Sequence, residues 1–92
     1  MISNPTIGAT STLALEANKQ GRRVLAVLCN NSNADMYACP GPTAIMTAGI
    51  PLKANGGSWT DKPDTMGCMY QGIYTAICAA GGKVLSVTEL NR

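Results

Sequence analysis

The stretch Arg23-Val24-Leu25-Ala26-Val27-Leu28-Cys29 indicates the fold class more clearly than any other part of the chain. It is apolar at successive positions and rich in Val and Leu, so both of its faces would meet apolar neighbours. A run of this length is far too short to cross a bilayer. The sequence therefore predicts a central β-strand over residues 23–29, covered on each side.

Turn signals come at short intervals on both sides of this strand. They are Asn4-Pro5, residues 18–21, residues 30–33, residues 40–42, residues 55–57, residues 62–64 and Gly81-Gly82. Short strands at a spacing of about 8–12 residues, bounded by Gly, Pro and Asn, are typical of sandwiches and barrels. We therefore expect an all-β chain, a compact antiparallel β-sandwich or jelly-roll-like barrel of about seven or eight short strands.

Two of these turns predict hairpins. Residues 72–79 and 83–89 flank Gly81-Gly82, and glycine supplies the positive φ that a tight hairpin turn demands. Residues 50–53 and 58–60 flank Asn55-Gly56-Gly57 in the same way.

Two further segments read as short strands. Residues 35–39 form one that ends where Pro40 and Pro42 cannot donate to a ladder. Residues 11–17 alternate in a strand-like pattern, although their Ala and Leu content would also suit two turns of helix, and strand is favoured.

Three local features have a physical interpretation of their own. Asn30, followed by Asn31 and Ser32, can end a strand through bonds from side chain to backbone. Gly72 admits a close approach beside Tyr70 and Tyr74, and Glu89 is interpreted as a solvent-facing charge that protects an exposed strand edge.

The composition indicates a chain that is completed by partners. Its 92 residues make one domain, which buries only about 60–65% of its unfolded surface. Charged residues are 13% of the chain, against about 25% in an average soluble domain. A free monomer needs a more charged surface, so we expect neighbouring molecules to cover much of this one.

Residues 1–8 are expected to be an N-terminal arm, and residues 9–92 a single β-sandwich domain. The arm is polar and contains a proline. It either frays as a terminus or orders on a partner, with Ile2, Pro5 and Ile7 as the anchoring residues.

The charge distribution argues against a nucleic acid partner, and the shortness of the apolar runs argues against a membrane partner. The net charge is +2, and among the basic residues only Arg22 and Arg23 are adjacent, which is typical of a solvated turn. A basic stripe interleaved with aromatic residues is not visible. The N-terminus lacks the pattern of a signal peptide, so we expect synthesis in a cytosol.

The residue types exclude most catalytic chemistry. Histidine is absent, which removes the commonest general base and the commonest metal ligand. The carboxylates are Glu16, Asp35, Asp61, Asp64 and Glu89, and the two in the 61–64 loop are interpreted as solvated. We therefore expect no enzyme, no catalytic residue, no metal and no cofactor.

The cysteines carry the most distinctive signal. Cys29, Cys39, Cys68 and Cys78 contain no C-x-x-C pair, so a zinc ribbon is poorly supported. They are interpreted either as small buried hydrophobes or as candidate disulfide residues, within a chain or between subunits. Three intrachain connectivities are open, and the sequence does not choose among them.

Trp59 and Tyr70 are candidate interface aromatics. Their strand-like context favours packing in a core or an interface. The alternative is a platform on which a sugar ring stacks.

The order of several segments resembles a group of small virion proteins of tailed bacteriophages. The segments are residues 22–32, Met36 to Cys39, Gly49 to Leu52 leading to residues 56–59, residues 70–76, residues 81–84 and residues 87–89. The resemblance spans residues 22 to 90. It is an ordered pattern of turns and strands and contains no catalytic signature.

The resemblance implies a compact β-sandwich in a virion, made in the host cytoplasm. Its implied role is a capsid decoration (cement) protein that binds the major capsid protein or other virion proteins, with a homotrimer favoured. The four cysteines depart from the usual pattern, which leaves open whether covalent links reinforce the particle. A tail, neck or fibre adaptor is the first alternative, and a carbohydrate-binding adhesin module is the second.

Overall fold

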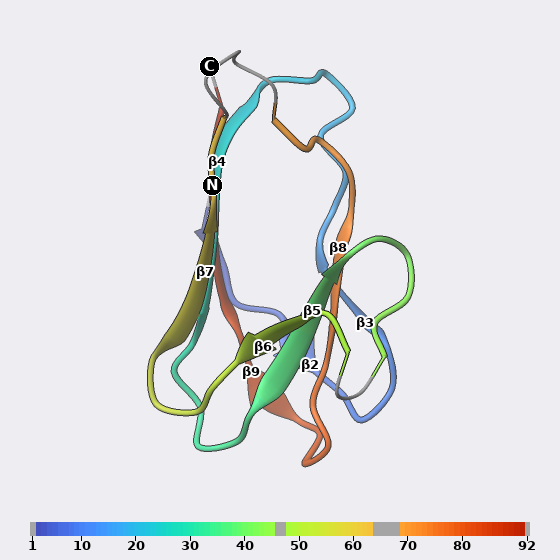
Figure 1. Cartoon of the computed structure of the whole chain (residues 1–92), viewed down its shortest axis with the longest axis vertical. Coiled ribbons are helices and arrows are strands. Elements are labelled where there is room, and N and C mark those ends of the chain that lie inside the picture. The colour runs from blue at the N-terminus through green and yellow to red at the C-terminus, as the bar shows by residue number, and fades with distance from the viewer. Residues whose placement is uncertain (1, 46–47, 64–68, 92) are drawn as a thin grey trace.

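The fold is a sandwich of two antiparallel sheets, and Figure 1 shows the two sheets facing each other. The computed structural model describes residues 2–45, 48–63 and 69–91. These residues contain ten strands, arranged in two four-stranded sheets and one two-stranded sheet. The predicted all-β sandwich is confirmed, with more and shorter strands than expected.

We name the two larger sheets after a strand in the middle of each. The β4 sheet has the order β1 (Ile2–Ser3), β10 (Ser86–Asn91), β4 (Arg23–Asn30) and β7 (Gly57–Asp61). The β8 sheet has the order β3 (Thr12–Leu15), β8 (Tyr74–Ile77), β5 (Met36–Pro40) and β6 (Ile50–Leu52). The small sheet pairs β2 (Thr6–Ile7) with β9 (Lys83–Val84).

The core lies between the two larger sheets. On β4 the inward positions are Ala26 and Leu28, and on β8 they include Tyr74 and Ala76. Alternation along each strand gives every inward residue a partner on the opposite sheet. The buried apolar cluster is Ile7, Ala14, Leu15, Ala26, Leu28, Met36, Ala38, Leu52, Tyr74, Ala76, Cys78, Leu85 and Val87.

Both hairpin predictions are wrong in the same way. Gly81 and Gly82 have φ values of 68° and 63°, so the turn does need glycine, but β8 and β10 lie in different sheets. The turn at Asn55 and Gly56, with φ values of 63° and 115°, likewise connects β6 of one sheet to β7 of the other. Crossing between sheets buries the apolar faces of successive strands against each other, which a hairpin within one sheet cannot do.

The remaining strand predictions agree with the structure. Residues 11–17 contain a strand and no helix, with a register shift between Leu13 and Leu15 where β3 pairs with β8. The strand over residues 35–39 is β5, and it ends at Pro40.

Residues 2–8 are part of the sandwich, which corrects the expectation of a separate arm. Ile2 pairs with Thr88 on β10, and the Leu85 amide donates to the Pro5 carbonyl at 3.0 Å. Ile7 is fully buried in the core and cannot anchor a partner. The physical reason is that β1 and β2 supply backbone partners to β10 and β9. Ile2 is the anchor residue that stays open, at 74% exposure.

Candidate functional site

The outer side of the β4 sheet is an uncharged surface. The registers place Ile2, Thr88, Val27 and Thr60 in one row across all four strands. Alternation adds the neighbouring outward positions on β4, β10 and β7. We call the set the outer face; it comprises Ile2, Leu25, Val27, Cys29, Ser58, Thr60, Ser86, Thr88 and Leu90. Its members are apolar, or carry a hydroxyl group, and none is charged.

Nothing in the described chain covers the outer face. Ile2 is 74% exposed and Leu90 is 48% exposed, while Leu25, Val27 and Cys29 are half-buried by their neighbours. The sequence predicted a strand covered on both sides at residues 23–29, but a single chain covers only the inner side. An antiparallel sheet that faces water on one side normally alternates apolar and polar residues. The β4 strand therefore presents an apolar side that remains to be buried.

The outer side of the β8 sheet behaves differently, because its own chain covers the middle of it while Leu13 and Pro51 near its margins stay exposed. Thr75 and Ile77 alternate with the core residues of β8, yet they are 3% and 9% exposed. The Thr75 hydroxyl donates to the Gly41 carbonyl at 3.0 Å, and the Ala44 amide donates to the Ser11 hydroxyl at 2.8 Å. The loop after β5 thus lies over this sheet.

A buried ion pair closes one end of the sandwich. Arg23 begins β4, and its Nε lies 2.6 Å from the Glu89 carboxylate on β10, with side-chain exposures of 0% and 8%. This corrects two predictions, because Arg23 is no solvated turn residue and Glu89 does not face solvent. The sequence contains only a partial sign of this ion pair, namely an arginine that is followed directly by an apolar run.

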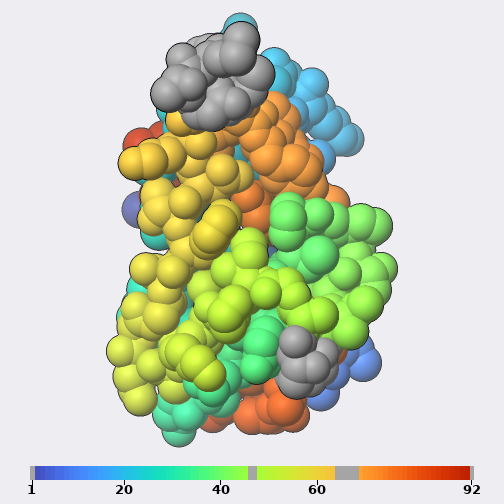
Figure 2. All heavy atoms as spheres, in the orientation of Figure 1, coloured from blue at the N-terminus to red at the C-terminus, as the bar shows by residue number. Residues whose placement is uncertain are grey.

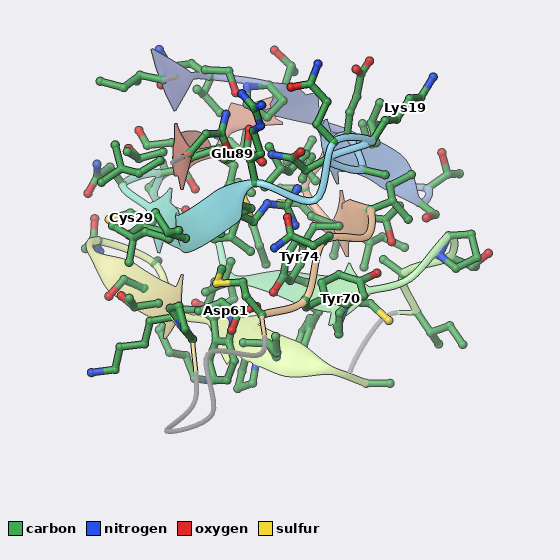
Figure 3. All side chains as sticks on the ribbon, turned by 90° about the horizontal axis from the view of Figure 1, so that it is seen from above. Lys19, Cys29, Asp61, Tyr70, Tyr74 and Glu89 are labelled. Atoms are coloured by element: carbon green, nitrogen blue, oxygen red, sulfur yellow. The ribbon has the colours of Figure 1, made fainter. Side chains whose placement is uncertain are left out.

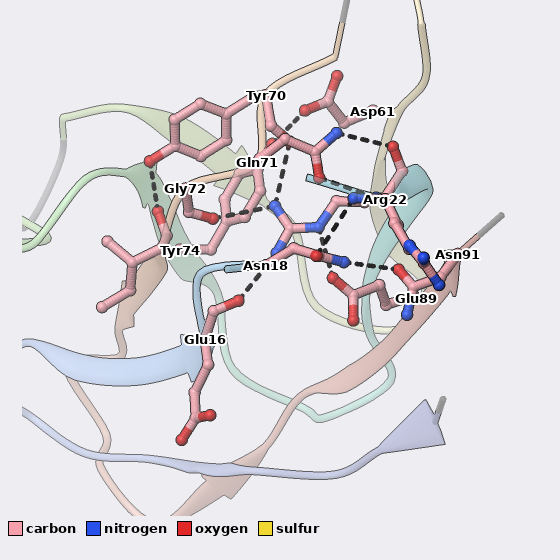
Figure 4. A network of polar contacts seen from close by, with 12 residues as sticks. Glu16, Asn18, Arg22, Asp61, Tyr70, Gln71, Gly72, Tyr74, Glu89 and Asn91 are labelled. Carbon is pink, nitrogen blue, oxygen red and sulfur yellow. Dashed lines mark hydrogen bonds and ion pairs between the residues drawn. The ribbon is translucent and has the colours of Figure 1, made fainter. Parts of the chain in front are cut away.

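Three backbone carbonyls accept from the Nη atoms of the Arg23 guanidinium, while its Nε pairs with Glu89 (Figure 4). Its Nη1 donates to Tyr70 at 3.2 Å and to Gly72 at 2.9 Å, and its Nη2 donates to Glu16 at 2.8 Å. The Gln71 side chain bonds the backbone of Arg23 on both sides, accepting from its N–H and donating to its carbonyl, each at 2.8 Å. Because each donor meets an acceptor, the network ties together four separate chain segments.

Tyr74 and Asp61 form a second polar contact at the same end. The Tyr74 hydroxyl donates to the Asp61 carboxylate at 2.5 Å, and the Arg23 guanidinium lies 5.9 Å from the centre of the Tyr74 ring. Burial, and then the hydrogen bond to negatively charged Asp61, raise the pKa of the Tyr74 hydroxyl well above its usual value. Seen from above in Figure 3, Asp61, Tyr70 and Tyr74 lie together. Tyr74 contacts both Asp61 and Tyr70, and we interpret this cluster as stabilising the fold.

The candidate interface aromatics occupy different environments. Tyr70 is 38% exposed, but its ring meets Tyr74 edge-on at 5.3 Å and its hydroxyl donates to the Ile73 carbonyl at 2.7 Å. A Cβ at Gly72 would overlap the Tyr70 ring, so a side chain at this position would displace the ring from where it lies. Trp59 is 39% exposed on β7, opposite Leu28 and toward the inner side. Figure 2 shows β7 and the segment before it along one face of the molecule.

The described cysteines Cys29, Cys39 and Cys78 are free thiols, and Cys68 lies outside the described residues. Cys39 is opposite Thr75, whereas Cys78 follows Ile77, which is opposite Tyr37. The two thiols are thus about three positions apart along the ladder, roughly 10 Å, beyond the reach of a disulfide. Cys29 lies in the other sheet, on the outer face. No intrachain bridge joins these three.

A pocket lies on the far side of the sandwich from β7. Its volume is about 400 Å³. It opens between the segment that contains β3 and the segment that contains β1, each the outermost strand of its sheet. The lining residues are Ser3, Pro5, Leu13, Ala14, Leu15, Glu16, Ala17, Asn18 and Glu89. Of these residues, Pro5 was predicted only as an anchor of the N-terminal arm. No sequence pattern predicted that the lining residues form a pocket.

Comparison with known proteins adds no relative. No family model, no curated protein and no solved structure matches the chain. In the described ranges, no cluster of His, Cys, Asp or Glu could hold a metal ion. The same ranges contain no helix with the length and apolar character of a membrane span.

Proposed function

We propose that this chain is a non-enzymatic structural component of a virion, a capsid decoration protein that binds and stabilises the outer shell. The observation that carries the proposal is the uncharged outer face of the β4 sheet. Exposed apolar surface of this kind, unbroken by charge, is typical of protein–protein contacts. The tailed-phage resemblance of residues 22–90 supplies the particular partner, the major capsid protein.

The proposed mechanism is passive burial. The outer face would lie across contacts between shell subunits, with Val27 at its centre and Ile2 and Leu90 near its margins. At about 25 cal/mol per Å², burial of some hundreds of Å² of apolar surface yields several kcal/mol per copy. Association costs reduce this figure. Because a shell binds many copies, small increments add up to a stabilised particle.

The outer face also accounts for the low charge content of the chain, because a surface that is buried on a shell needs no charged residues. The described chain covers the middle of the outer side of the β8 sheet with its own loop but leaves the outer face of the β4 sheet uncovered, and this asymmetry gives the domain one side suited to docking. A homotrimer, which the resemblance favours, would place several such faces on the shell together.

The test is co-sedimentation with empty shells assembled from the major capsid protein of the same virus. We expect saturable binding at hundreds of copies per shell, and at least a tenfold loss of affinity in Leu90→Lys. The matched control is Thr43→Lys, which adds the same charge on the exposed loop over the other sheet. A protein that stays in the supernatant, or a Leu90→Lys variant that binds as well as the unmodified chain, contradicts the proposal.

Copy number separates the decoration role from a tail, neck or fibre adaptor. Quantitative mass spectrometry of complete particles and of tailless shells makes the comparison directly. Tens of copies or fewer, present only on complete particles, would assign the chain to the tail.

A further inference from the structure

We propose that the pocket between β1 and β3 binds an extended peptide segment from another chain, one that alternates apolar side chains and carries a basic side chain. We call it the N-terminal groove. It lies beside the N-terminal segment and the inner side of the β4 sheet, whereas the proposed shell contact uses the outer face of that sheet. Failure of one proposal therefore leaves the other standing.

The floor of the groove is apolar. Pro5, Leu13, Leu15 and Ala17 line it, together with Ala14, which is 5% exposed. A volume of about 400 Å³ exceeds what one side chain fills. Apolar pockets of this size with a few placed polar groups are typical of binding sites.

The charge of the groove is acidic. Its charged lining residues are Glu16 and Glu89, and no basic side chain lines it. The Glu89 carboxylate is held by Arg23, which cancels its charge. Glu16 is exposed, and Figure 4 shows its carboxylate pointing away from the Arg23 guanidinium. The net charge favours a basic group in whatever occupies the groove.

The shape favours an extended chain over a compact small molecule. One wall is the continuous stretch of residues 13–18, and the opposite wall is Ser3 and Pro5. Both β3 and β1 are outermost strands, so each has one side without a neighbouring strand. Backbone groups on such an edge are available to pair with an added strand, and pockets along it select every second side chain.

Existing backbone hydrogen bonds limit where an added peptide strand can pair with the wall formed by residues 13–18. The Glu16 carbonyl already accepts from Arg23, and the Asn18 amide donates to the Gln71 carbonyl at 2.7 Å. An added strand would therefore pair with β3 itself, over Thr12–Leu15. Its basic side chain would then reach Glu16, just beyond the end of that strand.

The experiment titrates the full chain with blocked heptapeptides and follows its amide signals by NMR. The probe is acetyl-Thr-Val-Thr-Val-Lys-Val-Thr-amide, and its partner has Glu in place of Lys. We expect shifts at Ser3 and across residues 13–18, and binding about two- to fivefold tighter for the Lys peptide, as an exposed ion pair gives.

Variants locate the site and test the charge. Glu16→Lys should reverse the preference between the two peptides, whereas Asp35→Lys, with the same change in net charge elsewhere, should retain it. Ala17→Trp should fill the groove and abolish binding, whereas Ala79→Trp, on an exposed turn, should not. Circular dichroism of each variant confirms that it folds.

Three results overturn the proposal. The first is the absence of shifts at these residues up to millimolar peptide. The second is shifts that centre on another surface. The third is saturation by octylamine with no response to either peptide, which would make the groove a site for small amphiphilic cations.

Discussion

Arg23 shows how one charged residue can be buried without loss of the fold. Removing a guanidinium from water costs several kcal/mol unless its donors are satisfied. Here the Glu89 carboxylate and three backbone carbonyls accept from it, and the Tyr74 ring lies beside it. The apolar strand β4 can therefore begin with an arginine and still enter the core.

Replacing Arg23 with Met should destabilise the protein by about 3–5 kcal/mol, because the buried Glu89 carboxylate loses its cation. The double variant Arg23→Met with Glu89→Leu should recover part of this loss. Urea unfolding measures both. The control is Arg22→Met, which alters an exposed arginine and should change the free energy of unfolding by less than about 0.5 kcal/mol. Equal effects at the two arginines would refute the assignment.

Tyr74 should make stability fall in alkali. Its pKa is raised in the folded state, so above about pH 10 the unfolded chain ionises at this residue while the folded chain does not. The folded state then binds more protons, and the free energy of unfolding decreases as pH rises. Absorbance at 295 nm should show a tyrosine that resists ionisation until unfolding. That late fraction should be absent in Tyr74→Phe.

At the scale of the elements, Asn30 organises the turn after β4. Its amide donates to the Ala34 carbonyl at 2.7 Å and to the Leu52 carbonyl at 2.8 Å, and its oxygen accepts from the Ser32 amide at 3.0 Å. The predicted strand ending is confirmed here. A fully buried side chain thereby joins β4 to a turn and to β6 of the opposite sheet.

Asn30→Ala should cost about 2–3 kcal/mol, because buried carbonyls lose their donor. Asn33→Ala, at an exposed position of the same turn, should be close to neutral. Thermal unfolding compares the two, and hydrogen exchange at Ser32 should accelerate only in the first. Similar melting temperatures for both variants would show that the turn does not depend on Asn30.

The positions of the strands were easier to predict from the sequence than the pairing between them. Apolar runs and alternation identify residues 23–29 and 11–17 as strands, because side-chain periodicity is a local property. Glycines with positive φ at residues 81–82 suit a hairpin and a crossing between sheets equally well, so the turn alone cannot choose. The Arg23–Glu89 pair joins residues 66 apart, and the groove collects residues from three segments. Neither the ion pair nor the groove produces a local pattern in the sequence, so neither could be predicted.

On the scale of the whole molecule, the two sides of the sandwich differ. Among the described residues, a loop lies over the middle of the outer side of the β8 sheet, whereas none covers the outer face of the β4 sheet. With a net charge of +2 and a pI of about 8.4, little repulsion keeps bare faces apart near that pH.

Self-association of the isolated chain should therefore peak near pH 8.4, as measured by static light scattering. Ile2→Lys should reduce it strongly, because the charge falls on the outer face. Thr43→Lys adds the same charge on the loop over the other sheet and should reduce it much less. Equal reductions would mean that net charge alone governs association.

The chain changes sheets at nearly every connection: β3 to β4, β4 to β5, β6 to β7 and β7 to β8 all cross the sandwich. Neither sheet is encoded by a contiguous piece of sequence, so a fragment ending anywhere near the middle leaves both sheets incomplete. Loops must close before most contacts form, so refolding should take milliseconds to seconds. A nascent chain would gain its fold only after β10, the last of the ten described strands in chain order, has left the ribosome and inserted between β1 and β4.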